Sequence, residues 1–319
     1  MSSSAASAAG KADAAGAPPL RVICGPTAAG KSRIALALAE RHRAAIVSAD
    51  SRQVYRGFDV GTAKPSAAER ACVPHYGIDV AEPTLRFSAA EWAAAAEGWI
   101  ADARAEGREV VVVGGTGFYL RALFDPLFAA PAVNAPRRER LEAFLAPLAV
   151  SELRRWCERL DPPRAHLGRA QLLRSVETAL LVGRRLSDLH RASARAPRHT
   201  ARYLVVDPGP TLGEWIAARV EAMLDAGWVE EARALADLVP PDAPAWKASG
   251  YGVVRRLAAG EIGRTEAARL VTVETRQYAK RQRTWFRHQL SGEVTRVDPR
   301  DERCEAIVEA WWRGERSVA

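Results

Sequence analysis

The feature that most limits the possible folds of this chain is a glycine-rich octapeptide, Gly25-Pro26-Thr27-Ala28-Ala29-Gly30-Lys31-Ser32. It follows the short apolar run Leu20–Cys24 and precedes helix-forming sequence from Ser32 to Arg41. A turn of this pattern between a strand and a helix is typical of a phosphate-binding loop. In such a loop, backbone N–H groups, the lysine ammonium and the helix N-terminus surround phosphate oxygens, and the serine hydroxyl reaches Mg²⁺. We therefore predict that all eight residues bind a diphosphate or nucleotide, and that Ser32 is a ligand of Mg²⁺.

Strands and helices alternate along the first part of the chain. Apolar runs at Ala44–Val47 and Glu109–Val113 predict two further strands, with a helix at about Ser88–Glu106 between them. Glycine or aspartate stands at the strand ends, which favours an α/β fold with a P-loop NTPase-like parallel sheet flanked by helices. Such sheets bind ligands at the carboxyl ends of their strands, where Asp50 and Thr116 fall.

Strand signals are missing from about Phe124 to Arg198, and the chain there predicts helices only. One more strand is predicted at Tyr203–Asp207, and an edge strand at Thr295–Asp298. We therefore predict a disordered tail over residues 1–18, a core formed by residues 19–123 and 200–319, and a helical insertion domain at 124–199. The remaining predicted helices are Leu141–Leu148, Ser151–Leu160, Gln171–His190, Gly213–Leu238, Gly250–Ala258, Thr265–Phe286 and Glu302–Arg313.

Composition excludes several classes of protein. The 48% of apolar and 26% of charged residues are ordinary for a globular protein, and no apolar run approaches the ~18–20 residues of a membrane span. The four cysteines form no Cys-x-x-Cys pair, which argues against a zinc site and a disulfide framework. The N-terminal residues do not resemble a signal peptide. We expect a cytoplasmic, monomeric protein with no membrane contact.

The net charge of +8 is unevenly distributed. No acidic residue occurs from Thr275 to Leu290, and four of the cations there are spaced to lie on one helix face. Cations bind nucleic-acid phosphates, and the interleaved Tyr278, Trp285 and Phe286 could stack on bases. A solvated face with core aromatics is the alternative. We predict nucleic-acid contacts at Arg276, Lys280, Arg283 and Arg287.

Asp50 follows the second strand, at the same sheet edge as the phosphate loop. Its carboxylate could take a proton from a nucleophile, or could cap a turn. A hydrolytic NTPase usually has an acidic residue closing an apolar strand, but Glu109–Val113 ends in Gly-Gly-Thr, and Asp207 is followed by proline. This argues against a motor or switch NTPase. The loop Gly61–Pro65 predicts either another phosphate contact or a plain turn.

Several ordered motifs together resemble the tRNA dimethylallyltransferase (tRNA isopentenyltransferase) family of bacterial type. They are the octapeptide, Asp50-Ser51-Arg52-Gln53-Val54-Tyr55, Gly61-Thr62-Ala63-Lys64-Pro65, Gly114-Gly115-Thr116-Gly117-Phe118-Tyr119, Gly250-Tyr251 and the tract Arg276–Arg287. The resemblance implies transfer of a dimethylallyl group from dimethylallyl diphosphate to N6 of the adenosine adjacent to the anticodon in tRNA. It implies that the phosphate loop grips the leaving diphosphate with Mg²⁺.

The resemblance also assigns residues. Asp50, Thr116 and Arg219 would be catalytic, with Asp50 accepting the N6 proton and Thr116 contacting the target nucleotide. The insertion would clasp tRNA. Further tRNA contacts would come from Ser51, Arg52, Gln53, Arg138, Gln171 and Arg174.

The chain departs from the family pattern in places. Where the family usually shows Gln-Arg, this chain has Gln171-Leu172, so one arginine contact is absent. Gly252 replaces a residue that is often charged in the family, and no Cys/His zinc module follows the basic tract, unlike the eukaryotic form.

Three other functions stay open from the sequence. A small-molecule P-loop kinase would explain the phosphate loop but not the long insertion or the acid-free tract. An adenylate isopentenyltransferase would share the core but act on free nucleotide. A non-catalytic RNA-binding protein would not need Lys31, Ser32 and Asp50.

Overall fold

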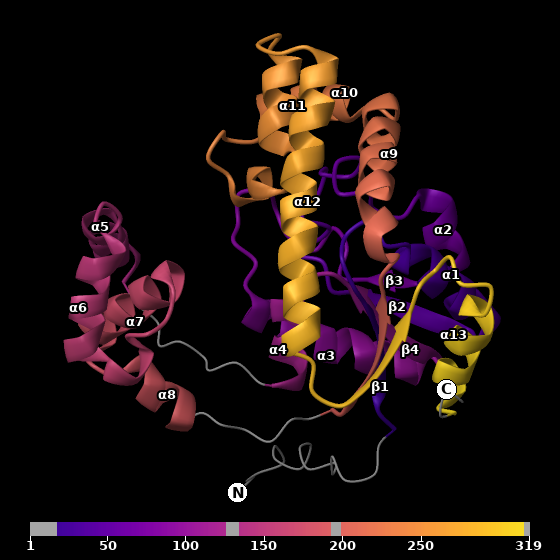
Figure 1. Ribbon diagram of the computed structural model, residues 1–319, viewed down its shortest axis with the longest axis horizontal. Helices are drawn as coiled ribbons and strands as arrows, with labels where there is room; N and C mark the ends of the chain where they lie inside the picture. The colour runs from indigo at the N-terminus through magenta and orange to yellow at the C-terminus, as the bar shows by residue number, and fades with distance from the viewer. Residues whose placement is uncertain (1–17, 126–133, 193–198, 316–319) are drawn as a thin grey trace, which may run out of the picture. The chain divides into compact units, whose positions relative to one another are not determined.

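The computed structural model describes residues 18–125, 134–192 and 199–315 (Figure 1). The predicted disordered tail lies outside these residues, apart from Pro18. The chain divides into two compact units, of which one comprises residues 1–124 and 197–319 and the other residues 125–196. The second unit corresponds to the insertion predicted at 124–199. No helix within the described residues has the length and apolar character needed to cross a membrane.

A six-stranded, wholly parallel sheet forms the centre of the first unit and confirms the predicted fold class. Its order is β3-β2-β4-β1-β5-β6. The strands β2, β4 and β1 are almost continuous apolar runs because helices cover both faces of such a sheet. The strands are β1 (Leu20–Cys24), β2 (Ala44–Ser48), β3 (His75–Tyr76), β4 (Glu109–Gly114), β5 (Ala201–Val206) and β6 (Glu293–Val297).

The predicted helices of the first unit lie near their predicted positions with one correction, and the structure adds two helices, Ala67–Cys72 and Gly117–Phe124, that were not predicted. The single helix predicted at 213–238 is two helices, because Gly227 adopts φ +97° between them, a left-handed conformation that ends a helix. The long helix α12 lies beside α9 and α11 (Figure 1). The helices are α1 (Lys31–Arg41), α2 (Ala67–Cys72), α3 (Ala89–Ala105), α4 (Gly117–Phe124), α9 (Leu212–Asp225), α10 (Trp228–Leu238), α11 (Tyr251–Ala258), α12 (Arg264–His288) and α13 (Cys304–Arg313), with 3-10 turns at Gly209–Thr211 and Pro244–Lys247.

The second unit is a helical cluster with its own small core. Its elements are α5 (Ala135–Leu145), α6 (Val150–Leu160), a 3-10 turn at Pro162–Arg164, α7 (Arg169–Val182) and α8 (Leu186–Ala192). The single helix predicted at 171–190 is wrong, because Gly183 at φ +71° separates α7 from α8. Leu172 is fully buried against Leu145, Leu153 and Val176. An arginine at position 172 would therefore place a charge inside this core.

The parallel register brings three segments together at one sheet edge. Gly25 follows β1, Asp50 follows β2 two residues on, and Gly115 follows β4. The amide of Ala49 donates to Val113 O at 2.7 Å, and the amide of Thr116 donates to Ala49 O at 3.2 Å, so the ends of β2 and β4 are held together. Only glycine fits at position 25, because its φ is +144° and a Cβ there would lie 2.2 Å from Val206 O.

Candidate active site

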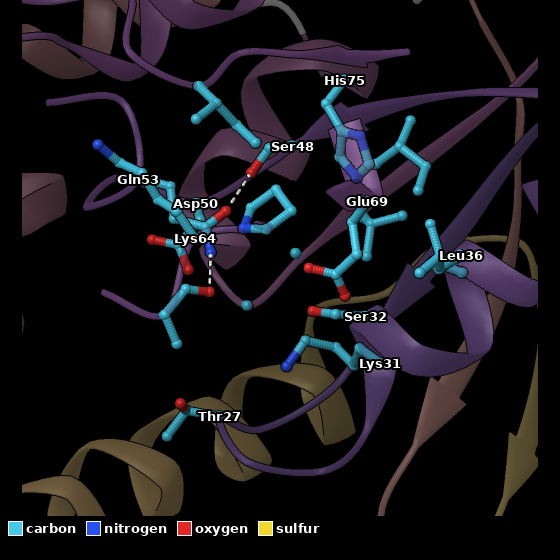
Figure 2. A pocket seen from close by; sticks show the side chains of 18 of the residues that line it. Thr27, Lys31, Ser32, Leu36, Ser48, Asp50, Gln53, Lys64, Glu69 and His75 are labelled. Carbon is cyan, nitrogen blue, oxygen red and sulfur yellow. Dashed lines mark hydrogen bonds between the residues drawn. The ribbon is translucent and has the colours of Figure 1, made fainter. Parts of the chain in front are cut away.

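The phosphate loop has the conformation that the octapeptide predicts. Ala28 and Gly30 adopt left-handed φ values of +62° and +87°, and Lys31 Nζ donates to Pro26 O at 2.6 Å. This geometry closes the loop and leaves the first turn of α1 with free N–H groups. Thr27, Lys31 and Ser32 line a cavity of about 150 Å³ (Figure 2).

The side-chain amide of Gln282 on α12 holds the phosphate loop in place. The amide of Thr27 donates to Gln282 Oε1 at 2.8 Å, and Gln282 Nε2 donates to Gly115 O at 2.8 Å. Gln282 is 6% exposed, so both bonds are shielded from water. Sequence reasoning gave Gln282 no role of its own, although its spacing from the buried Ala279 and Phe286 places it on the inward face of α12.

Asp50 lies on the wall of this cavity. Its Oδ1 accepts a hydrogen bond from the amide of Arg52 at 2.8 Å, an Asx turn that corresponds to the capping role foreseen for it. The same carboxylate lines the cavity together with Lys31 and Arg219 (Figure 2 labels Asp50 and Lys31). The structure thus places Asp50 beside the phosphate loop, as the strand order predicted, and brings Arg219 of α9 to the same cavity.

Two cations face Asp50 across this cavity. Burial, and then the neighbouring Arg219, lower the pKa of Lys31 to about 8. Burial also lowers the pKa of Arg219, and Asp50 opposes this shift. Arg219 forms no hydrogen bond or ion pair with any residue that the structure describes. A half-buried guanidinium that has no hydrogen-bond partner among the described residues and lies beside a phosphate loop is suited to bind an anion.

We expect the affinity for inorganic diphosphate to depend on the charge of Lys31. Its cation is present below its pKa of about 8 and is lost as the pH rises through that value. The ratio of wild-type to Lys31→Met affinity, measured by calorimetry from pH 6.5 to 9.5, should therefore be large at low pH and fall above about pH 8. Because both proteins bind the same diphosphate, protonation of the diphosphate affects both affinities equally and cancels in the ratio. A ratio that stays constant over this range would contradict a role for the Lys31 charge.

Thr116 connects the ends of β2 and β4 through its side chain. The amide of Ser51 donates to Thr116 Oγ1 at 3.0 Å, and Thr116 Oγ1 lies 3.3 Å from Ser51 Oγ. Tyr278 of α12 faces this pair, and burial, followed by the nearby Asp50, raises the pKa of its hydroxyl to about 12. Tyr278 therefore faces the site, whereas sequence reasoning left open whether it stacks on bases or belongs to the core.

Two other residues of the Asp50 segment differ in their surroundings. Gln53 accepts from Ser48 Oγ at 3.0 Å and donates to the carbonyl oxygens of Thr62 and Ala63, so its amide is engaged within the protein. Arg52 lines a second, smaller cavity on the other side of Asp50. The prediction that both bind tRNA stays a prediction, and Arg52 has the freer side chain of the two.

The loop at Gly61–Pro65 is a turn held from within the protein. The Glu231 carboxylate accepts hydrogen bonds from the backbone amides of Asp59, Val60 and Gly61, at 2.8, 2.6 and 3.2 Å. Lys64 Nζ donates to Tyr55 O at 2.6 Å and pairs with Asp59 and Asp79. Its side chain is only 2% exposed. Of the two predicted roles for this loop, the geometry favours the turn, because the amides of Gly61, Ala63 and Lys64 and the Lys64 ammonium already have partners within the protein.

Replacing Glu231 by Ala should lower the free energy of unfolding by about 1–3 kcal/mol, because three amides lose their acceptor. Urea titration measures the change. Tyr251 OH also donates to Glu231, at 2.5 Å, so Tyr251→Phe is the matched control and should cost only about 0.5–1.5 kcal/mol. Equal losses in the two variants would show that the amide contacts contribute nothing.

The basic tract does not present four free cations. Arg283 pairs with Asp207, at the end of β5, and donates to Gly209 O, while Arg276 donates to Gly213 O at 3.1 Å. Phe286 is buried. Trp285 packs on Gly117, where a Cβ would lie 2.3 Å from the indole. Lys280 and Arg287 are exposed, and their side chains pair with no described residue. The predicted face is thus partly an internal contact between α12 and the segment after β5.

The three polar residues predicted in the insertion lie on two of its helices. Arg138 of α5 pairs with Glu142 at 2.9 Å and with Glu177 at 2.6 Å, and Arg174 of α7 pairs with Glu177 at 3.4 Å. Gln171 is exposed. Glu177 is 7% exposed and brings both arginines to one place, a link that the sequence did not indicate.

Family models match most of the chain. The model described as IPP transferase covers residues 53–289, and that described as isopentenyl transferase covers residues 18–74. A tRNA dimethylallyltransferase of Anaeromyxobacter sp. is 47% identical over 279 residues, which are 85% of this chain and 92% of the relative. The tRNA dimethylallyltransferase of Deinococcus radiodurans is 38% identical over 92% of this chain and 97% of its own length.

Solved structures agree with these matches. A full-length tRNA isopentenylpyrophosphate transferase from Bacillus halodurans superposes with a TM-score of 0.64 at 31% identity, over 92% of this chain and 95% of its own. A eukaryotic dimethylallyltransferase acting on tRNA, 21% identical over 93% of this chain and 80% of its own, shares the fold with a TM-score of 0.76. This chain belongs to the IPP transferase family, the family of the tRNA dimethylallyltransferases.

Proposed function

We propose that this protein transfers the dimethylallyl group of dimethylallyl diphosphate to N6 of the adenosine adjacent to the anticodon in tRNA, and releases diphosphate. One observation carries the proposal. Lys31 and Arg219, the latter without a partner among the described residues, face Asp50 in a cavity that the phosphate loop borders. That arrangement combines an anion site with a proton acceptor.

The reaction follows from these groups. The adenosine nitrogen forms a bond to the allylic carbon, the carbon–oxygen bond to the diphosphate breaks, and the N6 proton passes to the Asp50 carboxylate. Negative charge grows on the diphosphate as it leaves, where Lys31, Arg219 and the loop amides stabilise it. An exocyclic amine is a weak nucleophile, so alignment of the two substrates supplies much of the rate.

The oxygen atoms near the phosphate loop suit Mg²⁺. Ser32 and the carboxylates of Asp50 and Glu69 line one cavity, and Glu69 lies beside Ser32 in Figure 2. Hydroxyl and carboxylate oxygens are ligands that Mg²⁺ takes together with substrate phosphates. We propose that Ser32 holds the ion, with Glu69 nearby. When bound, Mg²⁺ offsets the charge of the diphosphate.

The alternative functions have weaker support. The strand-end acids that a hydrolytic NTPase uses are not available for this purpose, since β4 ends at Gly114 and Asp207 is paired with Arg283. A small-molecule kinase would use the phosphate loop but not the separate insertion unit or the basic tract.

We expect Lys280 and Arg287 to contact tRNA phosphates, because they are the exposed cations of α12 without a described partner. The double variant Lys280→Ala/Arg287→Ala should reduce the slope of log affinity against log salt by about 0.7–0.9 for each lost contact. Filter binding across a salt series measures the slope. Arg283→Ala, by contrast, should lower the melting temperature because it leaves Asp207 unpaired. A slope that the double variant leaves unchanged would rule out this face as the contact.

Mass spectrometry of unmodified tRNA tests the proposed function. After incubation with the protein, Mg²⁺ and dimethylallyl diphosphate, one adenosine beside the anticodon should gain a dimethylallyl group, with no ATP required. Modification of free adenosine monophosphate instead of tRNA would favour the adenylate enzyme. Phosphoryl transfer from ATP would favour the kinase.

We further propose that the protein acts in the cytoplasm as a monomer. All the site residues of the core come from a single chain, and tRNA is a cytoplasmic substrate. Analytical ultracentrifugation at micromolar concentration should show one species near 34.6 kDa.

A further inference from the structure

An aromatic side chain is exposed at the rim of the proposed site. Phe118 is 56% exposed, and among the described residues of the first unit it is the only exposed Phe, Tyr or Trp. It lies two positions after Thr116, whose Oγ1 accepts a hydrogen bond from the amide of Ser51 at 3.0 Å. Ser51 directly follows Asp50. Two residues of chain reach at most about 7 Å, so Phe118 lies close to the residues that the proposed chemistry uses.

The exposure of Phe118 does not come from a loosely held backbone. Gly117, the residue before it, packs on Trp285 of α12, where a Cβ would lie 2.3 Å from the indole. Tyr119, the residue after it, stacks on the buried Trp92 of α3, with ring centroids 4.9 Å apart. Because both neighbours are fixed, a partner can bind the ring without first ordering the backbone, which lowers the entropic cost of binding.

The other residues of α4 show what kind of surface this is. From Tyr119 to Phe124 all are buried except Arg121, which is exposed. Arg121 stands three positions after Phe118, so the two exposed side chains lie on the same face of the helix. Aromatic rings and guanidinium planes are the groups on which proteins stack unpaired nucleobases. The exposed face of α4 therefore has the composition of a base-stacking surface.

The neighbouring surface of α12 is basic. Tyr278, Arg281 and Trp285 are spaced at i, i+3 and i+7, so they follow one face of α12 from the proposed site to the end that packs on α4 (Figure 1). Arg281 is exposed, and its guanidinium lies 5.8 Å from the centroid of the Tyr278 ring. No acidic residue occurs in this part of the helix. This charge attracts a polyanion, whereas a second copy of the chain, with its net charge of +8, would be repelled.

Resting on the proposed function, we infer that Phe118 stacks on the unpaired base that adjoins the target adenosine in the anticodon loop. The target base has to leave its stack to reach Asp50 in the cavity, and this costs free energy. The adjoining base thereby loses a stacking neighbour. The Phe118 ring at the rim takes the place of that neighbour and offsets part of the cost. Because every base has a flat face, this contact tolerates any of the four bases.

Binding of an anticodon stem-loop RNA, followed by fluorescence anisotropy without donor, tests the inference. Phe118→Ala should weaken binding about tenfold, as expected for the loss of one base–aromatic stack. Because no cation is removed, the slope of log affinity against log salt should stay at its wild-type value. Phe118→Trp should bind as tightly as the wild type, since it keeps a stacking ring. Inhibition by inorganic diphosphate should be the same in all these variants.

Leu85→Ala is the matched control, because Leu85 is an equally exposed apolar side chain of the same unit, at 59%. It should bind the stem-loop as the wild type does. A loss of affinity in Leu85→Ala equal to that in Phe118→Ala would overturn the inference. So would wild-type affinity in Phe118→Ala.

Stem-loops that lack a single base identify the stacking partner. When the correct base beside the target adenosine is removed, the wild type and Phe118→Ala should bind with affinities within about twofold of each other. If the tenfold difference persists when either neighbouring base is removed, Phe118 does not stack on it and the inference is wrong. These measurements need no turnover, so a protein that binds as described but transfers no dimethylallyl group would contradict the proposed function alone.

Discussion

Replacing Asp50 by Asn should slow transfer in a single turnover by about 10²–10⁴-fold. This corresponds to about 3–5 kcal/mol at 1.36 kcal/mol for each factor of ten. The amide keeps an oxygen that can accept the Arg52 N–H, so the Asx turn survives, but it cannot take the N6 proton. Rapid-quench measurements at saturating tRNA and donor, with a melting curve, separate chemistry from folding.

Asp50→Ala is the companion variant for this prediction. It removes both the proton acceptor and the turn, so it should show the same loss of rate together with about 1 kcal/mol of lost stability. If Asp50→Asn turns over at a near wild-type rate while Asp50→Ala only melts earlier, the carboxylate is a cap and some other group takes the proton.

Replacing Arg219 by Gln should lower the rate of transfer by about 10²–10³-fold, the usual cost of removing one group that stabilises developing negative charge. Because the Arg219 guanidinium has no hydrogen-bond or ion-pair partner among the described residues, its replacement leaves no such group unpaired, and the fold should tolerate the change. Inhibition by inorganic diphosphate should weaken in parallel, whereas the KM for tRNA should change little.

Arg33→Gln, which removes an exposed cation from α1 beside the phosphate loop, is the control for general loss of charge. It should reduce the rate only slightly. Equal effects of the two substitutions would mean that Arg219 acts through the overall field of the protein and not by direct contact with the leaving group.

Local patterns in the sequence predicted the features that depend on neighbouring residues. The strand–loop–helix unit at Leu20–Arg41 needs only its own apolar run, glycines and helix formers, and the structure confirms it. The helix breaks at Gly183 and Gly227 were missed, although glycine inside a helical pattern was a visible signal. A helical pattern continues on both sides of these glycines, and only the left-handed φ ends the helix.

Interactions between distant residues could not be predicted in this way. Nothing near Gln282 in the chain indicates that its side-chain amide bridges Thr27 and Gly115. Likewise, nothing near Glu231 indicates that its carboxylate accepts hydrogen bonds from three backbone amides. Charge patterns had the same limit. The cation spacing on α12 was read correctly, but whether Arg283 meets solvent or Asp207 depends on where β5 ends in space.

The hydrogen bond between Thr27 and Gln282 joins residues 255 positions apart, and this separation has a consequence for biosynthesis. A ribosome adding about 5–20 residues per second needs roughly 13–51 s to pass from one partner to the other. During the first part of that interval β1, β2 and β4 can pair, but β5 follows only at residue 201 and α12 only at residue 264, so the edge of β1 at first has no neighbour on that side. Unpaired edges of nascent parallel sheets are prone to aggregate. The N-terminal strands therefore expose one side of β1 until β5 is made, and a truncated chain that stops before α12 lacks the Gln282 contact that holds the phosphate loop.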